Sequence, residues 1–384
     1  MRLLSVHSGN LYGGVERLLS TVVKHRVACP DLHLSFGLCF EGRSSAELRQ
    51  LGADVYILGP ARIRNPISVR RVRANLAALL AAEQFDVVIT QMPWAQYLFG
   101  PVVRNFGLPN GCWIHDLPDG RHWLQRLASR KPPDFTIANS EFTASQVPLL
   151  FPGVPNFVLY PPVAAPDPAF AAARGKLRHQ LGLGPQQVAI LQTSRIEAYK
   201  GLGVLVEALA QLADDPRWQA FVVGGPQRPH ESRFLRQVQR AAQWHGLGDR
   251  IRFLGERRDA RQLMASADIF VQPNIRPEPF GLVFAEALYA GLPVVTSATG
   301  GPLEIFRGGY GVLLPPDSVN ELAEALRRLV EDGDLRRQYQ HSEPRRAEQL
   351  CNPTKQIQRL AVLLQQAVAG DYASPKIAAI GAHS

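Results

Sequence analysis

The sequence predicts an α/β protein built from two doubly wound parallel-sheet domains. Short apolar runs alternate with stretches of helical periodicity along the chain, which is the pattern of repeated βαβ units. A chain of 384 residues, of which 46% are hydrophobic, can bury a large core and is long for one domain. Residues 160–168 contain four prolines without periodicity, which favours an extended connector between the two domains.

In the first half, seven short apolar runs are expected to form strands. Helical spacing lies between them, most clearly at residues 15–24, 69–82 and 142–150. An alternation of strands and helices makes the strands parallel, because each helix returns the chain to the same end of the sheet. The expected strands are residues 3–6, 34–39, 55–58, 87–89, 112–114, 135–138 and 157–159.

A glycine pair follows the first expected strand. Gly13 and Gly14 stand where the next helix begins, so a ligand can approach the backbone closely at this point. The amides at a helix N-terminus also favour a phosphate. A glycine pair alone is weak evidence, because it is more often only a turn.

His115 stands at the end of the apolar run 112–114. In α/β proteins the carboxyl end of a strand is where ligands are bound. A single histidine at such a position is nevertheless more often structural than functional.

In the second half, two cations follow the first expected strand. Arg195 and Lys200 stand between residues 188–191 and a helix expected at 202–212. Two cations at the carboxyl end of a strand suit a diphosphate, and their spacing lets them occupy opposite sides of the turn. The alternative is a surface loop with ordinary charges. Further strands are expected at residues 220–223, 252–254, 268–272 and 292–296.

Two glutamates, Glu278 and Glu286, stand eight positions apart between two of these strands. Pro279 disfavours helix at Glu278, so the Glu278 side chain should project from a loop. Glu286 falls within the helix expected at residues 282–290. For one such glutamate alone, a capping or solvated residue is the better interpretation, but the apolar strands on both sides argue against it here.

The start of this helix predicts a phosphate site. The amides of Gly281, Leu282 and Val283 have no acceptor within the helix, and an anion is favoured there. Glu286 lies on the same face as Leu282, about 6 Å further along the axis. A phosphate at the helix end would leave a ribose near Glu286 and another group near Glu278. A sugar nucleotide has that shape.

Glu278 and Glu286, with the intervening Pro-Phe-Gly, resemble the paired-glutamate signature of the family 4 glycosyltransferases, enzymes of the GT-B fold. The following runs 286–295 and 300–304 are similar to the same family, and the resemblance extends along nearly the whole chain. It implies two Rossmann-like domains that face each other across a cleft. The expected parts are an acceptor-binding domain at 1–164, a donor-binding domain at 165–354, and a helix with a loose tail at 355–384 that returns to the first domain.

The resemblance implies a retaining transferase that moves a sugar from a nucleoside diphosphate sugar, UDP- or GDP-linked, to an acceptor hydroxyl. The acceptor would be a glycan or a lipid-linked molecule of cell-envelope polysaccharide or glycolipid synthesis. No cofactor and no metal are expected. The positions implied to bind the donor are Gly13, Gly14, Arg195, Lys200, Glu278, Phe280, Gly281, Leu282, Val283 and Glu286.

The resemblance also implies the roles of individual residues. Arg195 and Lys200 would neutralise the leaving diphosphate, and Glu286 would hold the ribose. Glu278 and His115 would orient the transferred sugar, so Arg195, Lys200, Glu278 and His115 are the implied catalytic residues. The weaker candidates for contact with the acceptor are Asp116, Asp119 and Arg121.

The sequence Asp332-Gly333-Asp334 matches the carboxylate pair with which metal-dependent glycosyltransferases of another fold bind manganese. The two aspartates fall between two expected surface helices, residues 319–330 and the stretch from 335 onward. We therefore interpret the pair as helix punctuation and not as a metal site.

Two other functions remain open from the sequence. A nucleotide-sugar epimerase on the same fold would need acid and base groups beside the sugar, for which Asp116 or Glu16 could serve. The second alternative is a binding protein that has lost catalytic activity. The presence of the expected residue at every donor-site position argues against it.

The net charge of +9 suits anionic ligands, anionic membranes or nucleic acid. No nucleic-acid-binding module is visible in the sequence. The one dense basic cluster is either a solvated helix face or a patch that rests on anionic lipid. Its members are Arg62, Arg64, Arg70, Arg71 and Arg73.

The four cysteines are scattered without paired spacing, which favours reduced thiols in a cytoplasmic protein. Residues 1–8 are expected to form a buried strand and not a signal peptide. No run reaches the roughly 18 apolar residues of a membrane span. We therefore expect a cytoplasmic protein that can bind peripherally to the inner face of a membrane.

Overall fold

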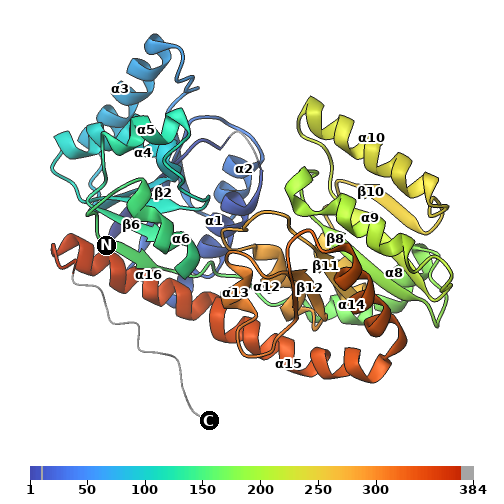
Figure 1. Ribbon diagram of the computed structural model, residues 1–384. Coiled ribbons are helices and arrows are strands. Elements are labelled where there is room, and N and C mark those ends of the chain that lie inside the picture. Colours follow the sequence, from blue (N-terminus) through green and yellow to red (C-terminus); the bar gives the residue numbers. More distant parts are fainter. Residues whose placement is uncertain (10–11, 373–384) are drawn as a thin grey trace. The chain divides into compact units, whose positions relative to one another are not determined.

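The computed structural model describes residues 1–9 and 12–372. Contacts divide the chain into two compact units (Figure 1). Unit 1 comprises Met1–Pro162 together with the chain from Cys351 onward, and unit 2 comprises Val163–Leu350. Positions 10 and 11 of the glycine-rich segment, and the expected loose tail from position 373 onward, lie outside the described residues.

Unit 1 contains a seven-stranded parallel sheet in the order β3-β2-β1-β4-β5-β6-β7. The order reverses between β1 and β4, which is the point where ligands bind in a doubly wound sheet. All seven predicted strands are confirmed, with bounds shifted by at most two residues. They are β1 (Arg2–His7), β2 (His33–Leu38), β3 (Asp54–Ile57), β4 (Val87–Gln91), β5 (Asn110–Ile114), β6 (Phe135–Ala138) and β7 (Asn156–Val158).

Helices cover both faces of this sheet, and α16 does so from the far end of the chain. They are α1 (Gly14–Lys24), α2 (Arg43–Gln50), α3 (Pro66–Ala82), α4 (Met92–Asn105), α5 (Trp123–Ser129), α6 (Glu141–Gln146) and α16 (Pro353–Val368). Helices α1 and α16 share a core with Leu3, whereas α3 and α4 share a core with Leu4. Successive residues of a strand point to opposite faces, so both faces of the sheet are buried.

Unit 2 contains a six-stranded parallel sheet in the order β10-β9-β8-β11-β12-β13, which reverses between β8 and β11. The five predicted strands are confirmed. The sixth, β13, was not predicted, because three half-buried residues at a sheet edge carry little periodicity. The strands are β8 (Val188–Thr193), β9 (Trp218–Val223), β10 (Ile251–Gly255), β11 (Ile269–Gln272), β12 (Val294–Ser297) and β13 (Val312–Leu314).

The helices of unit 2 pack on this sheet, and one core joins α9, α10 and α14 to β8, β9 and β11. They are α7 (Pro168–Ala172), α8 (Arg174–Gln180), α9 (Leu202–Ala210), α10 (Pro229–Trp244), α11 (Ala260–Ser266), α12 (Leu282–Tyr289), α13 (Pro302–Ile305), α14 (Val319–Glu331) and α15 (Gly333–Cys351). The prediction of two Rossmann-like parallel-sheet domains is therefore confirmed.

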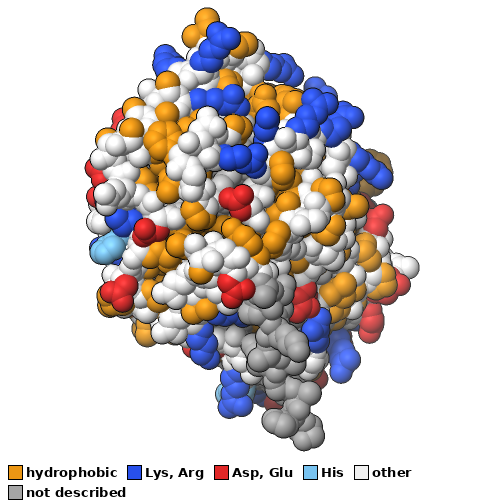
Figure 2. Space-filling view, turned by 90° about the vertical axis from the view of Figure 1, so that its left-hand side faces the viewer, with side chains coloured by type: hydrophobic (Ala, Val, Ile, Leu, Met, Phe, Trp, Pro, Cys, Tyr) orange, Lys and Arg blue, Asp and Glu red, His pale blue; other side chains and the backbone are white. Residues whose placement is uncertain are grey.

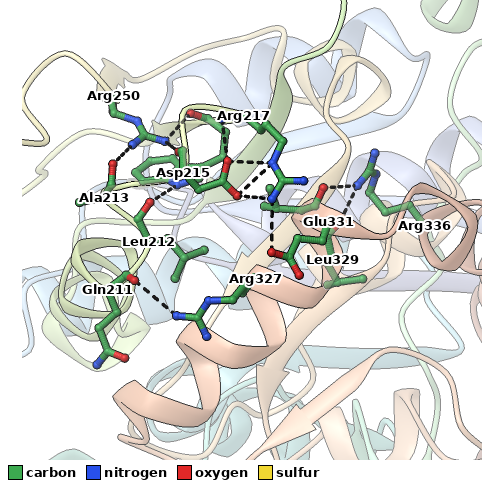
Figure 3. A network of polar contacts seen from close by, with 12 residues as sticks. Gln211, Leu212, Ala213, Asp215, Arg217, Arg250, Arg327, Leu329, Glu331 and Arg336 are labelled. Atoms are coloured by element: carbon green, nitrogen blue, oxygen red, sulfur yellow. Dashed lines mark hydrogen bonds and ion pairs between the residues drawn. The ribbon is translucent and has the colours of Figure 1, made fainter.

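A polar network joins the end of α14 to the segment before β9 (Figure 3). Arg217 donates to both carboxylate oxygens of Asp215 and lies 3.3 Å from Glu331. Arg250 donates to the carbonyl oxygen of Trp218 at 3.1 Å and stacks on its ring. Half-exposed ion pairs contribute little stability. The buried apolar side chains of α14 hold the helix in place, and the network orients its end.

Asp332 and Asp334 have the punctuating role that the sequence predicts. Asp332 ends α14, and its Oδ1 accepts a hydrogen bond from the amide of Leu335 at 2.8 Å. Asp334 pairs with Arg337 one turn further along α15. Asp332 therefore links the end of α14 to the start of α15, whereas Asp334 forms a pair within α15.

Candidate functional site

Lys200 and Glu278 form the buried centre of the predicted donor site in unit 2. Lys200 follows β8 and Glu278 follows β11, and these strands are neighbours in the sheet. Nζ of Lys200 lies 2.5 Å from Oε2 of Glu278, and each side chain is 11% exposed. The prediction that Glu278 projects from its loop is therefore wrong. Its carboxylate is turned inward because a buried ammonium group needs a charged partner.

Two glycines permit this close approach. Gly201 has φ +73°, and a Cβ there would lie 1.7 Å from the carbonyl oxygen of Pro273. Gly300 has φ +74°, and a Cβ there would lie 2.4 Å from the carbonyl oxygen of Glu278. The Gly300 backbone also forms a parallel bridge with Glu278. Any side chain at Gly201 or Gly300 would force the loops that carry Lys200 and Glu278 apart.

Asn274 is a site residue that the sequence analysis missed. Its Nδ2 donates to Oε2 of Glu278 at 3.2 Å, and its Oδ1 accepts from Nε2 of Gln272 at 3.1 Å. Asn274 is completely buried. The chain Gln272–Asn274–Glu278 therefore fixes the position of the carboxylate. The available signal was a glutamine and an asparagine at the end of an otherwise apolar strand.

Lys200 stays protonated and positively charged. Burial lowers the pKa of Lys200, but the Glu278 carboxylate more than offsets this effect, so the pKa is raised. An ammonium group has three N–H donors. Because Glu278 uses only part of this capacity, Lys200 can bind a phosphate oxygen and Glu278 together.

Arg195, the second predicted cation, also has a carboxylate partner. Its Nη2 lies 2.9 Å from Oε2 of Glu197, and the Arg195 side chain is 48% exposed. Glu197 was not predicted. The two cations thus differ, since Lys200 is buried and held firmly whereas Arg195 is exposed.

Helix α12 begins as predicted. Gly281 precedes it with φ +92°, and the first hydrogen bond runs from the amide of Phe284 to the carbonyl of Gly281 at 3.0 Å. The amides of Leu282 and Val283 have no acceptor within the helix. Glu286 is buried one turn further along. The segment therefore offers amide donors at the helix end and a carboxylate in its second turn.

Phe280 has a different role from its neighbours. Its side chain is 1% exposed and lies in the core of unit 2. The buried Phe280 side chain therefore anchors the loop to the core, and only the Phe280 backbone can contact a sugar nucleotide.

In unit 1, a buried glutamate holds the glycine pair. Gly13 precedes α1 and Gly14 is its first residue. Oε2 of Glu16 accepts from the amide of Gly13 at 2.8 Å, and Oε1 lies 2.6 Å from Nε2 of His7. Burial raises the pKa of Glu16, but its contacts with His7 and Gly13 more than offset this, so the pKa is lowered. Glu16 therefore ties the glycine pair to the end of β1.

His115 lies at the end of β5, as predicted, and its surroundings are specific. Its Nε2 lies 2.7 Å from Oε1 of Gln91, and its ring stacks on Trp113 with centroids 5.4 Å apart. Burial, with a smaller contribution from the charge of His7, lowers the pKa of His115 to about 3. His115 is therefore neutral at physiological pH. Gln91 was not predicted.

The three weaker acceptor candidates are exposed on the loop after β5. Oδ1 of Asp119 accepts from the amide of Arg121 at 3.0 Å. The amides of Asp119 and Gly120 both donate to Oε1 of Gln125. Asp119 therefore shapes its own loop, whereas the guanidinium of Arg121 and the carboxylate of Asp116 lie at the surface.

The basic cluster at the start of α3 forms an exposed feature that we call the basic tip. Asn65 caps the helix, and Ser68 donates from its hydroxyl to the carbonyls of Arg62 and Asn65. Ile67 is 76% exposed at the centre. Figure 2, which faces unit 1, shows basic side chains gathered beside apolar ones at its upper end. The basic tip consists of Arg62, Arg64, Ile67, Arg70 and Arg71, all exposed.

Arg73 does not belong to this surface, which corrects the sequence analysis. Its Nε donates to the carbonyl of Leu98 at 2.7 Å, and its Nη2 donates to the carbonyl of Tyr97 at 3.0 Å. It thus fastens α3 to α4. Along a helix, Arg73 falls on the side that faces α4, whereas Arg70 and Arg71 face outward.

Two features of the described residues bear on metal binding and on insertion into a membrane. Within residues 1–9 and 12–372, no group of three or more histidines, cysteines, aspartates or glutamates could hold a metal ion. Across the same part of the chain, no helix has the length and apolar character needed to span a bilayer.

Comparison with known proteins identifies the class of unit 2. Residues 173–346 match the family described as "Glycosyl transferases group 1". The matched segment contains Arg195, Lys200, Glu278 and Glu286. Most of unit 2 is therefore similar to this family of glycosyltransferases.

Curated relatives agree with this class. The chain is 34% identical over 206 residues to the D-inositol 3-phosphate glycosyltransferase of Actinosynnema mirum, which covers 51% of this chain and 49% of that protein. It is 31% identical over 219 residues to the lipopolysaccharide core biosynthesis mannosyltransferase LpsB of Rhizobium meliloti, which covers 55% and 58%. The chain thus spans about half the length of the curated relatives it matches.

A solved structure resembles the whole chain. Anabaena Alr3699/HepE in complex with UDP and glucose has a TM-score of 0.82 and 25% sequence identity, and the match covers 95% of this chain and 100% of that one. The prediction of a GT-B fold is confirmed by this likeness together with the two parallel sheets.

Proposed function

We propose that this protein is a retaining glycosyltransferase that moves a sugar from a nucleoside diphosphate sugar to an acceptor hydroxyl. The observation that carries the proposal is the group at the carboxyl end of the second sheet. A buried lysine, an exposed arginine and the start of α12 offer positive charge and amide donors at one sheet edge. This combination suits a diphosphate, and it lies within the segment that matches the group 1 family.

Each part of this group has a separate task. Arg195 and Lys200 neutralise the leaving diphosphate, and the amides of Leu282 and Val283 add donors where negative charge grows. The buried carboxylate of Glu286 accepts from the ribose hydroxyls. Glu278 orients the transferred sugar while it holds the ammonium group of Lys200.

The residues of unit 1 contribute to the same reaction. Gly13 and Gly14 allow a ligand to approach the start of α1, where Glu16 keeps the glycine pair in position. Neutral His115 borders the transferred sugar. Asp116 and Arg121 are available to the acceptor on the exposed loop that follows.

The donor is a UDP-linked hexose, and the acceptor is a glycan or glycolipid of the cell envelope. HepE, which resembles the chain over its full length, binds UDP and glucose. LpsB, one of the curated relatives, acts in lipopolysaccharide core biosynthesis. The likeness to LpsB supports a cell-envelope acceptor, whereas the relative from Actinosynnema mirum is named for a small phosphorylated inositol.

The reaction proceeds without a divalent metal ion. A leaving nucleoside diphosphate needs its growing charge to be balanced, and fixed cations do this without reorganisation. Lys200 and Arg195 supply two positive charges, and the start of α12 adds a partial one. Magnesium and manganese prefer oxygen ligands, whereas the carboxylates of Glu197 and Glu278 are already paired with Arg195 and Lys200.

The basic tip rests on an anionic membrane surface, where a lipid-linked acceptor would be found. The basic tip has four exposed arginines and an exposed isoleucine, and the sequence contains no acidic residue between Asp54 and Glu83. Basic residues next to anionic lipid contribute about 1 kcal/mol each. The hydrogen bonds of Ser68 and Arg73 hold this surface in shape, so little ordering entropy is lost on binding.

Turnover of a panel of UDP- and GDP-linked sugars tests the proposal. Release of nucleoside diphosphate should be seen with a UDP-hexose and should increase when an envelope glycan is added. The Arg195→Ala variant should bind and turn over the donor poorly while remaining folded. The proposal is overturned if no sugar nucleotide binds, or if an epimer accumulates without an acceptor.

A further inference from the structure

We propose that Gln91 is a positioning residue that holds His115 in the tautomer with the proton on Nε2, so that Nδ1 accepts a hydrogen bond from the bound ligand. The inference rests on the proposed function for the identity of the ligand. The tautomer itself is a property of unit 1 and can be tested without a substrate.

The first observation is a chain of hydrogen bonds with one consistent direction. Nε2 of Gln91 donates to Oγ of Ser5 at 3.0 Å, so the amide oxygen of Gln91 faces Nε2 of His115 at 2.7 Å. An amide oxygen can only accept a hydrogen bond. The proton of neutral His115 must therefore be on Nε2, which leaves Nδ1 as an acceptor.

The second observation is the burial of Gln91. It is 1% exposed at the end of β4, and both ends of its amide are occupied by Ser5 and His115. In this orientation the NH2 group of Gln91 donates to Ser5 and its oxygen faces Nε2 of His115, so both polar ends of the buried amide have a partner.

The third observation concerns the backbone next to Gln91. Met92, the first residue of α4, has φ +77°. A non-glycine residue with such a value is uncommon, and strained residues of this kind cluster at functional sites. Here the strained residue turns the chain from β4 into α4 directly after Gln91, so the glutamine stays at the strand end.

The surroundings of His115 restrict its ring further. Trp113 stacks on the ring, and the amide of Asn139 donates to the backbone carbonyl of His115 at 3.3 Å. Within the described residues, Nδ1 of His115 has no hydrogen-bond partner, and the residue is partly exposed. The charge of His7 adds to the effect of burial and lowers the pKa of His115 further.

This arrangement restricts the chemistry of the ligand group. A nitrogen acceptor pairs with a hydrogen-bond donor and repels an anionic oxygen. A sugar hydroxyl fits, whereas a phosphate oxygen or a sugar carboxylate does not. We therefore expect that Gln91 affects sugar transfer through His115 and leaves binding of the free nucleotide unchanged.

Nuclear magnetic resonance of the full chain with 15N-labelled histidine tests the tautomer, and His115→Ala assigns the signal. The unmodified protein should show the Nε2–H form alone for His115. Gln91→Met removes the acceptor but keeps the length of the side chain, and should give a mixture of tautomers. Gln91→Glu keeps an acceptor oxygen and should retain the Nε2–H form. Buried Gln96 provides the matched control, because it bonds to Thr90 and not to His115.

A double-mutant cycle tests the positioning role. Gln91→Met should lower kcat/KM for the sugar nucleotide by about ten-fold or more, since a misplaced hydrogen-bond donor or acceptor at a reacting group raises the activation free energy. It should have no further effect in the His115→Ala background, and Gln96→Met should change stability without changing the tautomer. The proposal is overturned if Gln91→Met leaves the His115 signal unchanged, or if its cost persists in the absence of His115. A protein that turns over no sugar nucleotide would refute the proposed function but leave the tautomer measurable.

Discussion

The ammonium group of Lys200 and the carboxylate of Glu278 lie 2.5 Å apart on the turns that follow two neighbouring strands of the second sheet. Both side chains are buried, and Asn274 binds the same carboxylate oxygen. Lys200, which we propose binds the diphosphate, is thus already paired with Glu278, which we propose orients the sugar. The contact couples the phosphate and sugar ends of the proposed donor site.

Glu278→Gln should separate these two ends. The substitution removes the negative charge that neutralises Lys200, while the amide oxygen can still accept from Asn274. The affinity for UDP should stay the same or increase, because the charge of Lys200 is then balanced by the diphosphate alone. Turnover should fall on the order of 100-fold, since a positioned charged group contributes to the transition state.

Isothermal titration calorimetry with UDP, beside steady-state kinetics with the sugar nucleotide, checks this prediction. Loss of UDP binding with normal turnover would show that the roles assigned to Glu278 and Glu286 are reversed.

Replacement of the two cations should have different consequences for folding. Arg195 is half exposed, so Arg195→Ala should change stability by less than about 1 kcal/mol. Lys200→Ala would leave the Glu278 carboxylate buried without its partner, at a cost of roughly 3–5 kcal/mol. The double change Lys200→Ala with Glu278→Gln removes both charges and should recover most of this stability.

Turnover should fall strongly in all three variants, and activity of the unmodified protein should survive EDTA. The measurements are urea denaturation for stability and donor turnover with and without chelator. Activity that disappears with EDTA and returns with manganese would contradict the charge-balance mechanism.

Glu286→Ala should weaken UDP binding by about ten-fold or more. A buried hydrogen bond to a charged group contributes roughly 1.5–3 kcal/mol, and the ribose contact already exists in the ground state. Exposed Glu321 on α14 provides a control with the same change of charge. Titration calorimetry of both variants decides the matter, and a folded Glu286→Ala protein with unchanged affinity would remove Glu286 from the ribose.

The sequence predicted the architecture well because both sheets are buried on two faces. Strands such as β1 and β8 are mostly apolar, and stretches of helical periodicity separate them clearly. The edge strand β13 escaped because it is short and half buried. The site residues that were predicted stand at positions that chain order defines, namely strand ends and helix starts.

The partners of these residues could not be predicted in the same way. Gln91 meets His115 only because the neighbouring strands β4 and β5 bring them together. Asn274 meets Glu278 through the turn of the loop that follows β11, and no local pattern reports either pairing. The predicted direction of the Glu278 side chain was wrong for a similar reason. Pro279 restricts the backbone of Glu278, whereas Lys200, which is distant in sequence, determines where the carboxylate points. Arg73 was grouped with a surface cluster because the position of α4 was unknown.

The basic tip should bind anionic vesicles through its own charges. Replacement of Arg64, Arg70 and Arg71 with glutamine should weaken binding to phosphatidylserine vesicles roughly 100-fold, at about 1 kcal/mol for each arginine. The matched control replaces three exposed arginines of α10, and changes the net charge equally. These are Arg233, Arg236 and Arg240.

Sedimentation with vesicles at low and high salt is the measurement. The parent protein and the α10 variant should both bind at low salt and be released as salt screens the surface. Equal loss of binding in the two variants would show a non-specific effect of net charge, and equal binding to neutral vesicles would leave the tip as a solvated helix end.

Glu343 on α15 should make the stability of unit 2 depend on pH. Its side chain is completely buried, and Oε1 accepts from the amide of Gly311 at 2.8 Å, while Oε2 has no partner within the described residues. Burial raises the pKa of Glu343 from 4.5 to about 7, although Gly311 and Arg346 oppose the rise. Between these two values the folded protein keeps a proton that the unfolded chain has lost.

The sign of the effect follows from this difference. Stability decreases with increasing pH wherever the folded state binds more protons than the unfolded state. The contribution of Glu343 is therefore fully retained below pH 4.5 and is lost between pH 4.5 and about 7. The total loss is on the order of 3 kcal/mol, at 1.36 kcal/mol per unit of pKa.

Glu343→Gln is neutral at every pH and should not lose this stability. Urea denaturation at several pH values from 5 to 8, with exposed Glu321→Gln as control, should show the advantage of Glu343→Gln over the parent growing with pH. A constant difference between the two proteins would show that Glu343 titrates normally.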